Sequence, residues 1–190
     1  MPPRTSLLRN LIASFLAAAS LAGISGNVSL SSANAAPIEP LHPAASDWQT
    51  IAHDTLGFKI SYPGSVFQPA PEQPSSVGQV LVSRDGTAKL LIAAFDNEAD
   101  SSLAEYRAHV LETSYPRAEI DYAPVRKSWF VLSGNREGTT FYERVSFTCQ
   151  GRRITSWAML YPYAQRHYYD RILEQIARTF QPSRTAPSGC

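Results

Sequence analysis

Residues 139–161, TTFYERVSFTCQGRRITSWAMLY, contain the most regular alternation of apolar and polar side chains in the sequence. A period of two predicts a β-strand with one buried face. The first strand is predicted from Thr139 to Cys149, and Glu143 is the only polar residue on its apolar face. Gln150-Gly151 then turns the chain into a second strand, Arg153–Tyr161. The apolar face of the first strand consists of Phe141, Val145, Phe147 and Cys149.

Turn signals divide the rest of the sequence into further strands. Asp54-Thr55 and Arg84–Thr87, which contains an Asp-Gly pair, are predicted to be hairpin turns. The four strands beside these two turns are expected to pair antiparallel, with Val66–Gly78 as a loop between the hairpins. Gly134-Asn135 is predicted to be a turn that ends the strand Ser128–Ser133. The predicted strands are Trp48–His53, Leu56–Tyr62, Gln79–Ser83, Ala88–Phe95, Glu119–Ala123 and Ser128–Ser133.

Two segments have helical spacing. Ser102 and Glu105 fit a capping box, and the helix that they begin should end by Tyr115, before Pro116. A second helix is predicted over Pro162–Thr179, because apolar residues recur there every four positions. Strands joined by short turns, with one helix between them and another at the end, predict an α+β domain. Its antiparallel β-sheet should be flanked by helices.

Several of these features resemble exported bacterial members of the PsbP-like superfamily. They are Trp48, the segment GFKISYP at 57–63, the Asp-Gly hairpin, the Ser102-Leu103-Ala104-Glu105 helix start, and Tyr161-Pro162 before the last helix. The resemblance covers residues 48–180 and implies an α/β/α sandwich with an antiparallel sheet between helices. It implies no single activity, because photosystem subunits, nuclear-transport cofactors and periplasmic proteins share this fold.

The first 36 residues have the three-part layout of a secretory signal. Arg4 and Arg9 precede the apolar run Leu11–Ile24, and Ala33-Asn34-Ala35 supplies small residues for cleavage. The apolar run is shorter than the roughly 20 residues that a spanning helix needs. We therefore expect cleavage near Ala35 or Ala36, a periplasmic or secreted product, and no stable membrane insertion. An uncleaved anchor is the alternative.

Composition predicts one domain between two tails. The expected division is a signal peptide at 1–36, a proline-containing tether at 37–46, a globular PsbP-like domain at 47–181 and a tail at 182–190. Cleavage after residue 35 removes two of the 17 basic residues and none of the 16 acidic ones, which leaves a formal net charge of −1. A near-neutral domain without a basic stripe is a poor candidate for nucleic-acid binding. No nucleic-acid partner is expected.

The sequence contains no strong catalytic or metal-binding motif. It has no Gly-x-Ser-x-Gly elbow, and its four histidines have no metal-ligand spacing. Asp96, Glu98 and Asp100 lack the glycine-centred pattern of a calcium loop. Because Cys149 falls on the apolar face of a predicted strand, a structural cysteine is favoured over a nucleophile. We therefore predict a protein that is not an enzyme, with no catalytic residues, metal or cofactor. The alternative is a small secreted hydrolase, whose site, for example Cys149 with His167, forms only in the fold.

The two cysteines of an exported protein can form a disulfide. A bond between Cys149 and Cys190 would close a loop of about 40 residues and stabilise the fold by roughly 4 kcal/mol in the chain-entropy model. Because Cys190 ends the chain, a free thiol and an intermolecular disulfide are the competing possibilities.

Tyrosine and arginine are dense around the last predicted helix. These residue types are enriched at binding hot spots, because each combines a large contact area with hydrogen bonds. We hypothesise that Arg152, Tyr163 and Arg166 converge outside the sheet and bind a small anionic ligand or an envelope protein. The alternative is that Tyr168 and Tyr169 face the core and the arginines are solvated. The function expected from the sequence is that of an exported non-enzymatic accessory or binding protein of the bacterial envelope.

Overall fold

The computed structural model describes residues 47–53, 57–71 and 78–182. The predicted signal peptide, the predicted tether and residues 183–190 of the predicted tail lie outside these ranges. Within them, no helix is long and apolar enough to cross a membrane. The strands are β1 Trp48–His53, β2 Phe58–Pro63, β3 Phe67–Pro69, β4 Gly78–Ser83, β5 Lys89–Asp96, β6 Glu119–Tyr122, β7 Trp129–Arg136, β8 Thr139–Thr148, β9 Arg153–Pro162 and β10 Gln181–Pro182. The α-helices are α2 Leu103–Thr113 and α3 Arg166–Thr179.

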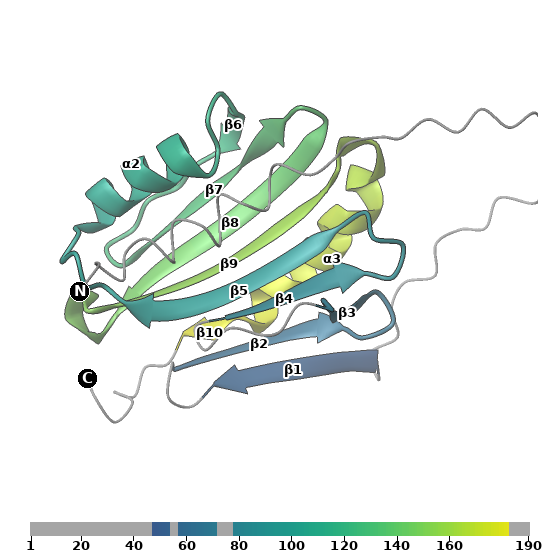
Figure 1. Cartoon of the computed structure of the whole chain (residues 1–190), viewed down its shortest axis with the longest axis horizontal. Coiled ribbons are helices and arrows are strands. Elements are labelled where there is room, and N and C mark those ends of the chain that lie inside the picture. The colour runs from purple at the N-terminus through teal and green to yellow at the C-terminus, as the bar shows by residue number, and fades with distance from the viewer. Residues whose placement is uncertain (1–46, 54–56, 72–77, 183–190) are drawn as a thin grey trace, which may run out of the picture.

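The strands form two antiparallel sheets, which confirms the predicted α+β class. The large sheet has seven strands in the order β3-β4-β5-β9-β8-β7-β6, and the small sheet has the order β1-β2-β10. Figure 1 shows the large sheet as a twisted layer with α2 on one side and α3 on the other. The small sheet shares the side of α3, where β2 packs against that helix.

The hairpin predicted from residues 139–161 lies inside the large sheet. β8 and β9 pair along their whole length, for example Phe141 with Leu160 and Val145 with Ser156. The predicted turn is confirmed as a short 3-10 turn, η3 Cys149–Gly151. The strand ends one residue earlier than predicted, however. Cys149 and Gln150 both adopt left-handed backbone angles, with φ of 53° and 59°, so Cys149 lies in the turn and not on the apolar strand face.

Both predicted N-terminal hairpins are present, but they belong to different sheets. β1 pairs with β2, and β4 pairs with β5, each antiparallel as expected. Sequence patterning did not separate the two pairs, because the sheet that a hairpin joins depends on contacts remote in sequence. The segment expected as a loop between them contains the short strand β3, which pairs with β4 at the edge of the large sheet.

The predicted turn at Gly134-Asn135 is wrong. Both residues lie inside β7, which continues to Arg136 and turns at Glu137 and Gly138. A Cβ atom at Gly134 would come within 1.9 Å of the backbone oxygen of Glu119 in β6. Glycine is therefore needed in this strand for the close approach of its neighbour, and not for a turn.

The first helix begins as predicted. The Ser102 side chain accepts a hydrogen bond from the backbone N–H of Glu105, and the Glu105 carboxylate accepts one from the N–H of Ser102. This capping box satisfies two amides that have no partner inside the helix. The helix ends at Thr113, just before Tyr115.

The second helix begins later than predicted. Pro162 is the last residue of β9, where it pairs with Thr139, and the 3-10 turn η4 Tyr163–Gln165 separates it from α3. The repeat of apolar residues within the helix is confirmed, since Tyr169, Ile172 and Ile176 are buried against the sheet.

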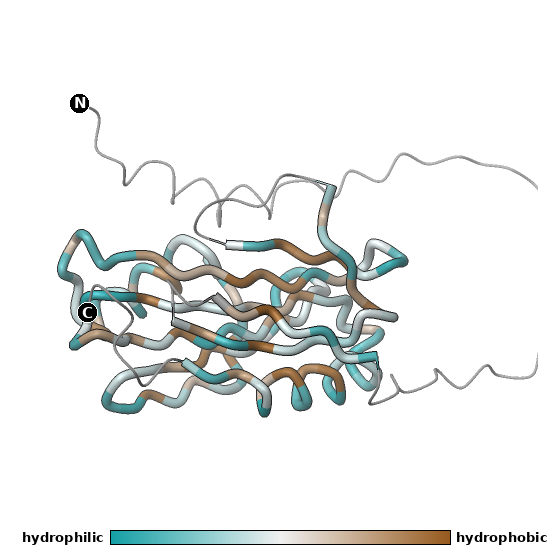
Figure 2. Tube along the Cα trace, turned by 90° about the horizontal axis from the view of Figure 1, so that it is seen from below, coloured by the Kyte–Doolittle hydropathy of each residue, from teal (hydrophilic) through white to brown (hydrophobic). Residues whose placement is uncertain are grey.

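Each face of the large sheet has its own core. The α3 face contains the larger cluster, whose strand residues come from both sheets, and Figure 2 shows hydrophobic residues concentrated within the strands and hydrophilic ones at the turns. The buried members on the α3 face include Ile60, Leu90, Ile92, Trp157, Met159, Tyr161, Tyr169, Ile172 and Ile176. The buried members on the α2 face are Val110, Tyr115, Phe130, Leu132, Phe141, Val145 and Ile154.

Glu143 is buried in the α2-side core, on the strand face that it interrupts in the sequence. Its side chain is 2% exposed, and its Oε1 accepts a hydrogen bond of 2.7 Å from the Ser156 hydroxyl. Burial raises the pKa of the Glu143 carboxyl, and hydrogen bonds from Ser156 and Tyr115 lower it by less. The environment therefore favours the neutral acid. The Tyr115 ring stacks on Phe141, with centroids 3.9 Å apart.

Candidate binding surface

Tyr163 and Arg166, two residues of the predicted binding set, meet where β9 passes into α3. The η4 turn places Tyr163 three residues before Arg166. The guanidinium carbon of Arg166 lies 5.4 Å from the centroid of the Tyr163 ring, and its Nη1 is 3.5 Å from the Tyr163 hydroxyl. Tyr163 is 48% exposed. The pair therefore presents an aromatic ring and a cation together at the surface.

Asp170 links this exposed pair to the core. Its carboxylate lies 3.6 Å from Nε of Arg166, one helical turn away, and accepts a hydrogen bond of 2.6 Å from the Tyr161 hydroxyl. Desolvation raises the pKa of Tyr161 far above its usual value, and the hydrogen bond and charge of Asp170 raise it further. The Tyr161 hydroxyl therefore stays protonated and keeps donating its hydrogen bond to Asp170. This bond holds the Asp170 carboxylate in position beside Arg166.

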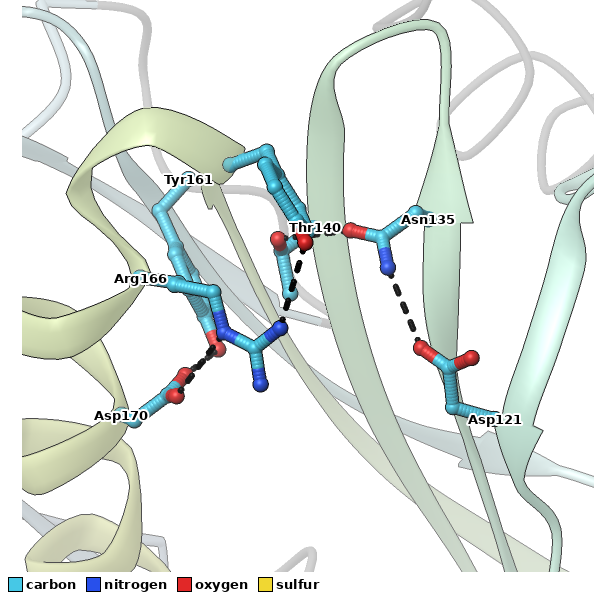
Figure 3. A network of polar contacts seen from close by, with 7 residues as sticks. Asp121, Asn135, Thr140, Tyr161, Arg166 and Asp170 are labelled. Carbon is cyan, nitrogen blue, oxygen red and sulfur yellow. Dashed lines mark hydrogen bonds and ion pairs between the residues drawn. The ribbon is translucent and has the colours of Figure 1, made fainter.

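A second set of polar side chains crosses the adjacent strands. The Thr140 hydroxyl donates to Oδ1 of Asn135 at 2.8 Å, and Nδ2 of Asn135 donates to Asp121 at 3.1 Å. Thr140 pairs with both Asn135 and Tyr161 in the sheet register, so all three lie on the α3 face. Figure 3 shows Arg166 extending from α3 toward Thr140 and Asn135. We call the whole set the polar row: Asp121, Asn135, Thr140, Tyr161, Arg166 and Asp170.

A pocket of about 330 Å³ adjoins the polar row at the β7–β8 turn. Asn135 belongs to both, and the backbone N–H of Tyr163 donates to the Gly138 carbonyl at 2.8 Å. Arg117 and Glu137 form an exposed ion pair of 3.5 Å across the pocket rim. The lining residues are Arg117, Glu119, Asn135, Arg136, Glu137 and Gly138. Two arginines and two glutamates give this lining no net charge.

Exposed apolar side chains lie near both ends of the polar row. Among the described residues, four large hydrophobic side chains are exposed: Ile120, Tyr122, Val125 and Tyr163. Ile120 and Tyr122 belong to β6, the strand that supplies Asp121, and Val125 follows it. Single exposed hydrophobic residues are common on soluble proteins, but their grouping beside exposed charges is typical of interaction sites.

Arg152, the third residue of the predicted binding set, lies elsewhere. It follows η3 at one end of β9, whereas Tyr163 follows the other end. A ten-residue strand spans roughly 30 Å, so Arg152 does not converge with Tyr163 and Arg166. The Arg152 carbonyl accepts a hydrogen bond from the backbone N–H of Asn97, which ties this turn to the segment before α2.

Cys149 is half-buried beside Arg152, and it is not a free thiol. This bonding state argues against Cys149 as the nucleophile of a hydrolase. Its predicted partner Cys190 lies outside the described residues, so the intramolecular pairing stays a prediction.

The other residues considered for chemistry lie apart from one another. His109 is on α2, where its ring is 6.3 Å from that of Tyr106. His167 is on α3, on the opposite side of the sheet, with Nε2 3.1 Å from Arg171. Asp96 forms an ion pair of 3.2 Å with Arg153. In the part of the chain that the structure describes, no three His, Cys, Asp or Glu side chains are grouped to hold a metal ion.

Sequence reasoning missed most of the polar row. Asp170 had a recognisable signal, because a carboxylate four residues after Arg166 in a helix has the spacing of an ion-pair partner. Asp121, Asn135 and Thr140 had none, since their proximity depends on the register of three strands. The alternative reading of the tyrosines is correct for Tyr169, which is 2% exposed in the core.

Comparison with solved structures identifies the architecture. The solution structure of cyanobacterial PsbP (CyanoP) from a Synechocystis species superposes with a TM-score of 0.53 at 15% identity, covering 77% of this chain and 99% of that one. The fold is PsbP-like. The Saccharomyces cerevisiae Ran-binding protein Mog1p shares this PsbP-like fold, with a TM-score of 0.52 at 13% identity over 71% of this chain and 95% of its own. No protein-family model and no curated protein matches the sequence.

Proposed function

We propose that this protein is an exported, non-enzymatic accessory protein of the bacterial envelope, which binds a protein partner through the surface around Tyr163 and Arg166. The observation that carries the proposal is the exposed Tyr163–Arg166 pair at one end of the polar row, with exposed Tyr122 next to Asp121 at the other. We call this area the β6–α3 surface: the polar row together with Tyr163 and Tyr122.

The β6–α3 surface has the physical properties of a protein-binding site. Its exposed tyrosine and arginine side chains supply contact area, and its charged groups supply hydrogen-bond donors and acceptors. The underlying polar groups already hold one another, so little conformational entropy is lost when a partner binds. An ordered surface of this kind can provide binding energy without catalytic chemistry.

The location rests on the sequence of the first 36 residues, whose three-part layout supports export. The solved structures support a binding role by analogy alone: Mog1p, with the same fold, is a Ran-binding protein. Neither protein is similar enough in sequence for its partner to be transferred to this chain.

A small anionic ligand is less well supported as the partner. The pocket at the β7–β8 turn has two glutamates beside its two arginines, so an anion would gain no net attraction from the lining. The ion pair between Arg117 and Glu137 in this lining is exposed to solvent. The proposal therefore concerns a protein partner.

Arg166 and Arg178 provide a matched test. Both are arginines on α3 that form an ion pair with an acid one turn away, Arg166 with Asp170 and Arg178 with Glu174. Immobilised mature protein should capture a partner from an envelope extract. We expect Arg166→Ala and Tyr163→Ala each to reduce the captured amount at least tenfold, as hot-spot truncations do, and Arg178→Ala to leave it unchanged.

Equal capture by the wild type and the three variants would contradict the proposed surface. The proposal would also fail if the wild type captured no protein beyond those that bind the empty support. Circular dichroism of each variant checks that the fold is intact. Mass spectrometry of the captured band identifies the partner, and repeating the capture with purified partner separates direct from indirect binding.

A further inference from the structure

β6 is an edge of the large sheet. In the described part of the chain it pairs with β7 on one side only, so about half of its backbone N–H and C=O groups face outward. All four of its residues are exposed. Unpaired edges of this kind are templates for an additional strand.

The opposite edge of the same sheet differs. β3 has three residues and ends in Pro69, which has no backbone N–H to donate. Edge strands that are short and contain proline resist pairing with another chain. Of the two edges of the large sheet, β6 is therefore the one whose backbone can accept a strand.

The side chains of β6 define what that strand must carry. Glu119 is paired in register with Asn135, and Asp121 bonds to the Asn135 amide, so both carboxylates lie on the α3 face. The Glu119 carboxylate forms no ion pair with another described residue. Ile120 pairs with Gly134 on the α2 face, where it is 37% exposed. The strand itself thus carries two carboxylates on one face and an apolar side chain on the other.

A second copy of the protein is a poor occupant. Two β6 strands paired antiparallel would bring the Glu119 and Asp121 carboxylates of both copies into one short ladder. Like charges opposite each other destabilise a sheet. The register shift between Ile120 and Tyr122 further limits the pairing of two identical edges. A basic strand meets no such repulsion.

We propose that β6 accepts an extended, basic segment of the partner protein as an additional strand of the large sheet. This inference rests on the proposed function, and it names how the partner is recognised. Lysine or arginine at alternate positions of the segment lies beside Glu119 and Asp121, and the intervening apolar residues lie beside Ile120. Because Pro116 and Pro124 flank β6, the added strand pairs over only a few residues.

Two charge-matched peptides test the strand. The first is an acetylated and amidated heptapeptide of alternating lysine and valine, and the second replaces each valine with proline. Both carry the same charge, but the proline peptide cannot form a ladder of hydrogen bonds. We expect the lysine–valine peptide to bind the full mature protein at least tenfold more tightly by fluorescence anisotropy. It should also slow hydrogen–deuterium exchange of the amides in residues 119–122.

Equal binding of the two peptides would overturn the proposal, because attraction between charges would then explain all of the affinity. Protection confined to residues outside 119–122 would overturn it as well. The double variant Glu119→Gln/Asp121→Asn keeps the size of both side chains and one acceptor oxygen on each, and it removes their charge. We expect it to weaken lysine–valine binding by roughly three- to tenfold, as loss of two cross-strand charge pairs should. Unchanged affinity of this variant would count against the recognition of a basic segment.

The two proposals can fail separately. If Tyr163→Ala and Arg166→Ala abolish partner capture but Glu119→Gln/Asp121→Asn does not, the β6–α3 surface binds a partner without an added basic strand. If no partner is captured by the wild type, the proposed function fails, whatever the peptide does.

Discussion

The two faces of the large sheet are covered by helices of different character. α3 buries Tyr169, Ile172 and Ile176 in the larger core, whereas α2 has one fully buried residue, Val110. The α2 face also contains Glu143, a buried acid. The two helices therefore contribute unequally to stability, because buried apolar area is the main stabilising term. The β6–α3 surface lies on the more strongly packed side.

The largest loss of stability is expected when a buried side chain of α3 is shortened. Ile176 is fully buried, and Ile176→Ala should lower the free energy of unfolding by about 2–5 kcal/mol through lost burial and a residual cavity. Val110→Ala removes less buried surface and should cost about 1.5 kcal/mol. Urea unfolding followed by circular dichroism measures both. If Val110→Ala costs as much as Ile176→Ala, α2 and α3 contribute equally to stability, which contradicts the difference inferred from their burial.

The next effect concerns the acid on the α2 face. Ser156→Ala removes the hydroxyl that donates to Glu143 and should cost about 1–3 kcal/mol, because a buried acceptor loses its partner. The free energy of unfolding, measured in urea at pH 4, provides the test. If Ser156→Ala lowers the free energy of unfolding by less than a serine-to-alanine change at an exposed position, the hydrogen bond from Ser156 to Glu143 does not stabilise the fold.

Glu143 should also give this face a distinct pH dependence. Burial raises its pKa in the folded protein above the ordinary value of 4.5. Its contribution to stability is therefore fully present below that ordinary value and is lost as pH rises through the raised pKa. Relative to wild type, Glu143→Gln should become progressively more stable between pH 4 and pH 8. Glu112→Gln, at an exposed position on α2, controls for the removed charge and should show no such trend.

Local patterns in the sequence were sufficient for most elements. The β8–β9 hairpin follows from period-two alternation, and the start of α2 follows from Ser102 and Glu105. Gly134 was misread, because a glycine that permits the approach of β6 looks the same in sequence as a glycine in a turn. The hypothesis that Arg152 converges with Tyr163 was wrong, because the strand predicted between them already implies their separation.

The candidate surface was less predictable than the fold. Tyr163 and Arg166 could be selected from composition, and their contact follows from spacing of three residues at a helix start. Asn135 connects Asp121 to Thr140 only because β6, β7 and β8 are adjacent in a specific register. Registers of this kind are set by packing over the whole sheet, which no single motif contains.

A smaller effect is expected at the start of α2. Ser102→Ala removes the side chain that caps the Glu105 amide and should cost about 1 kcal/mol. The matched variant Ser101→Ala changes the preceding serine, whose backbone N–H, and not its hydroxyl, bonds to Asn97. It should cost less than Ser102→Ala in thermal unfolding. Equal shifts of Tm for the two variants would mean that the capping box does not stabilise α2.

The smallest expected effect on stability is at Arg166, on the α3 side. Its ion pair with Asp170 spans 3.6 Å, and the Arg166 side chain is 55% exposed, so solvent screens the interaction. Arg166→Ala should change the free energy of unfolding by no more than about 0.5 kcal/mol, measured in urea beside Arg178→Ala. A larger loss would mean that Arg166 maintains the fold. If the expected result is obtained, loss of partner capture by Arg166→Ala cannot be attributed to unfolding, because the strongly packed face beneath it remains intact.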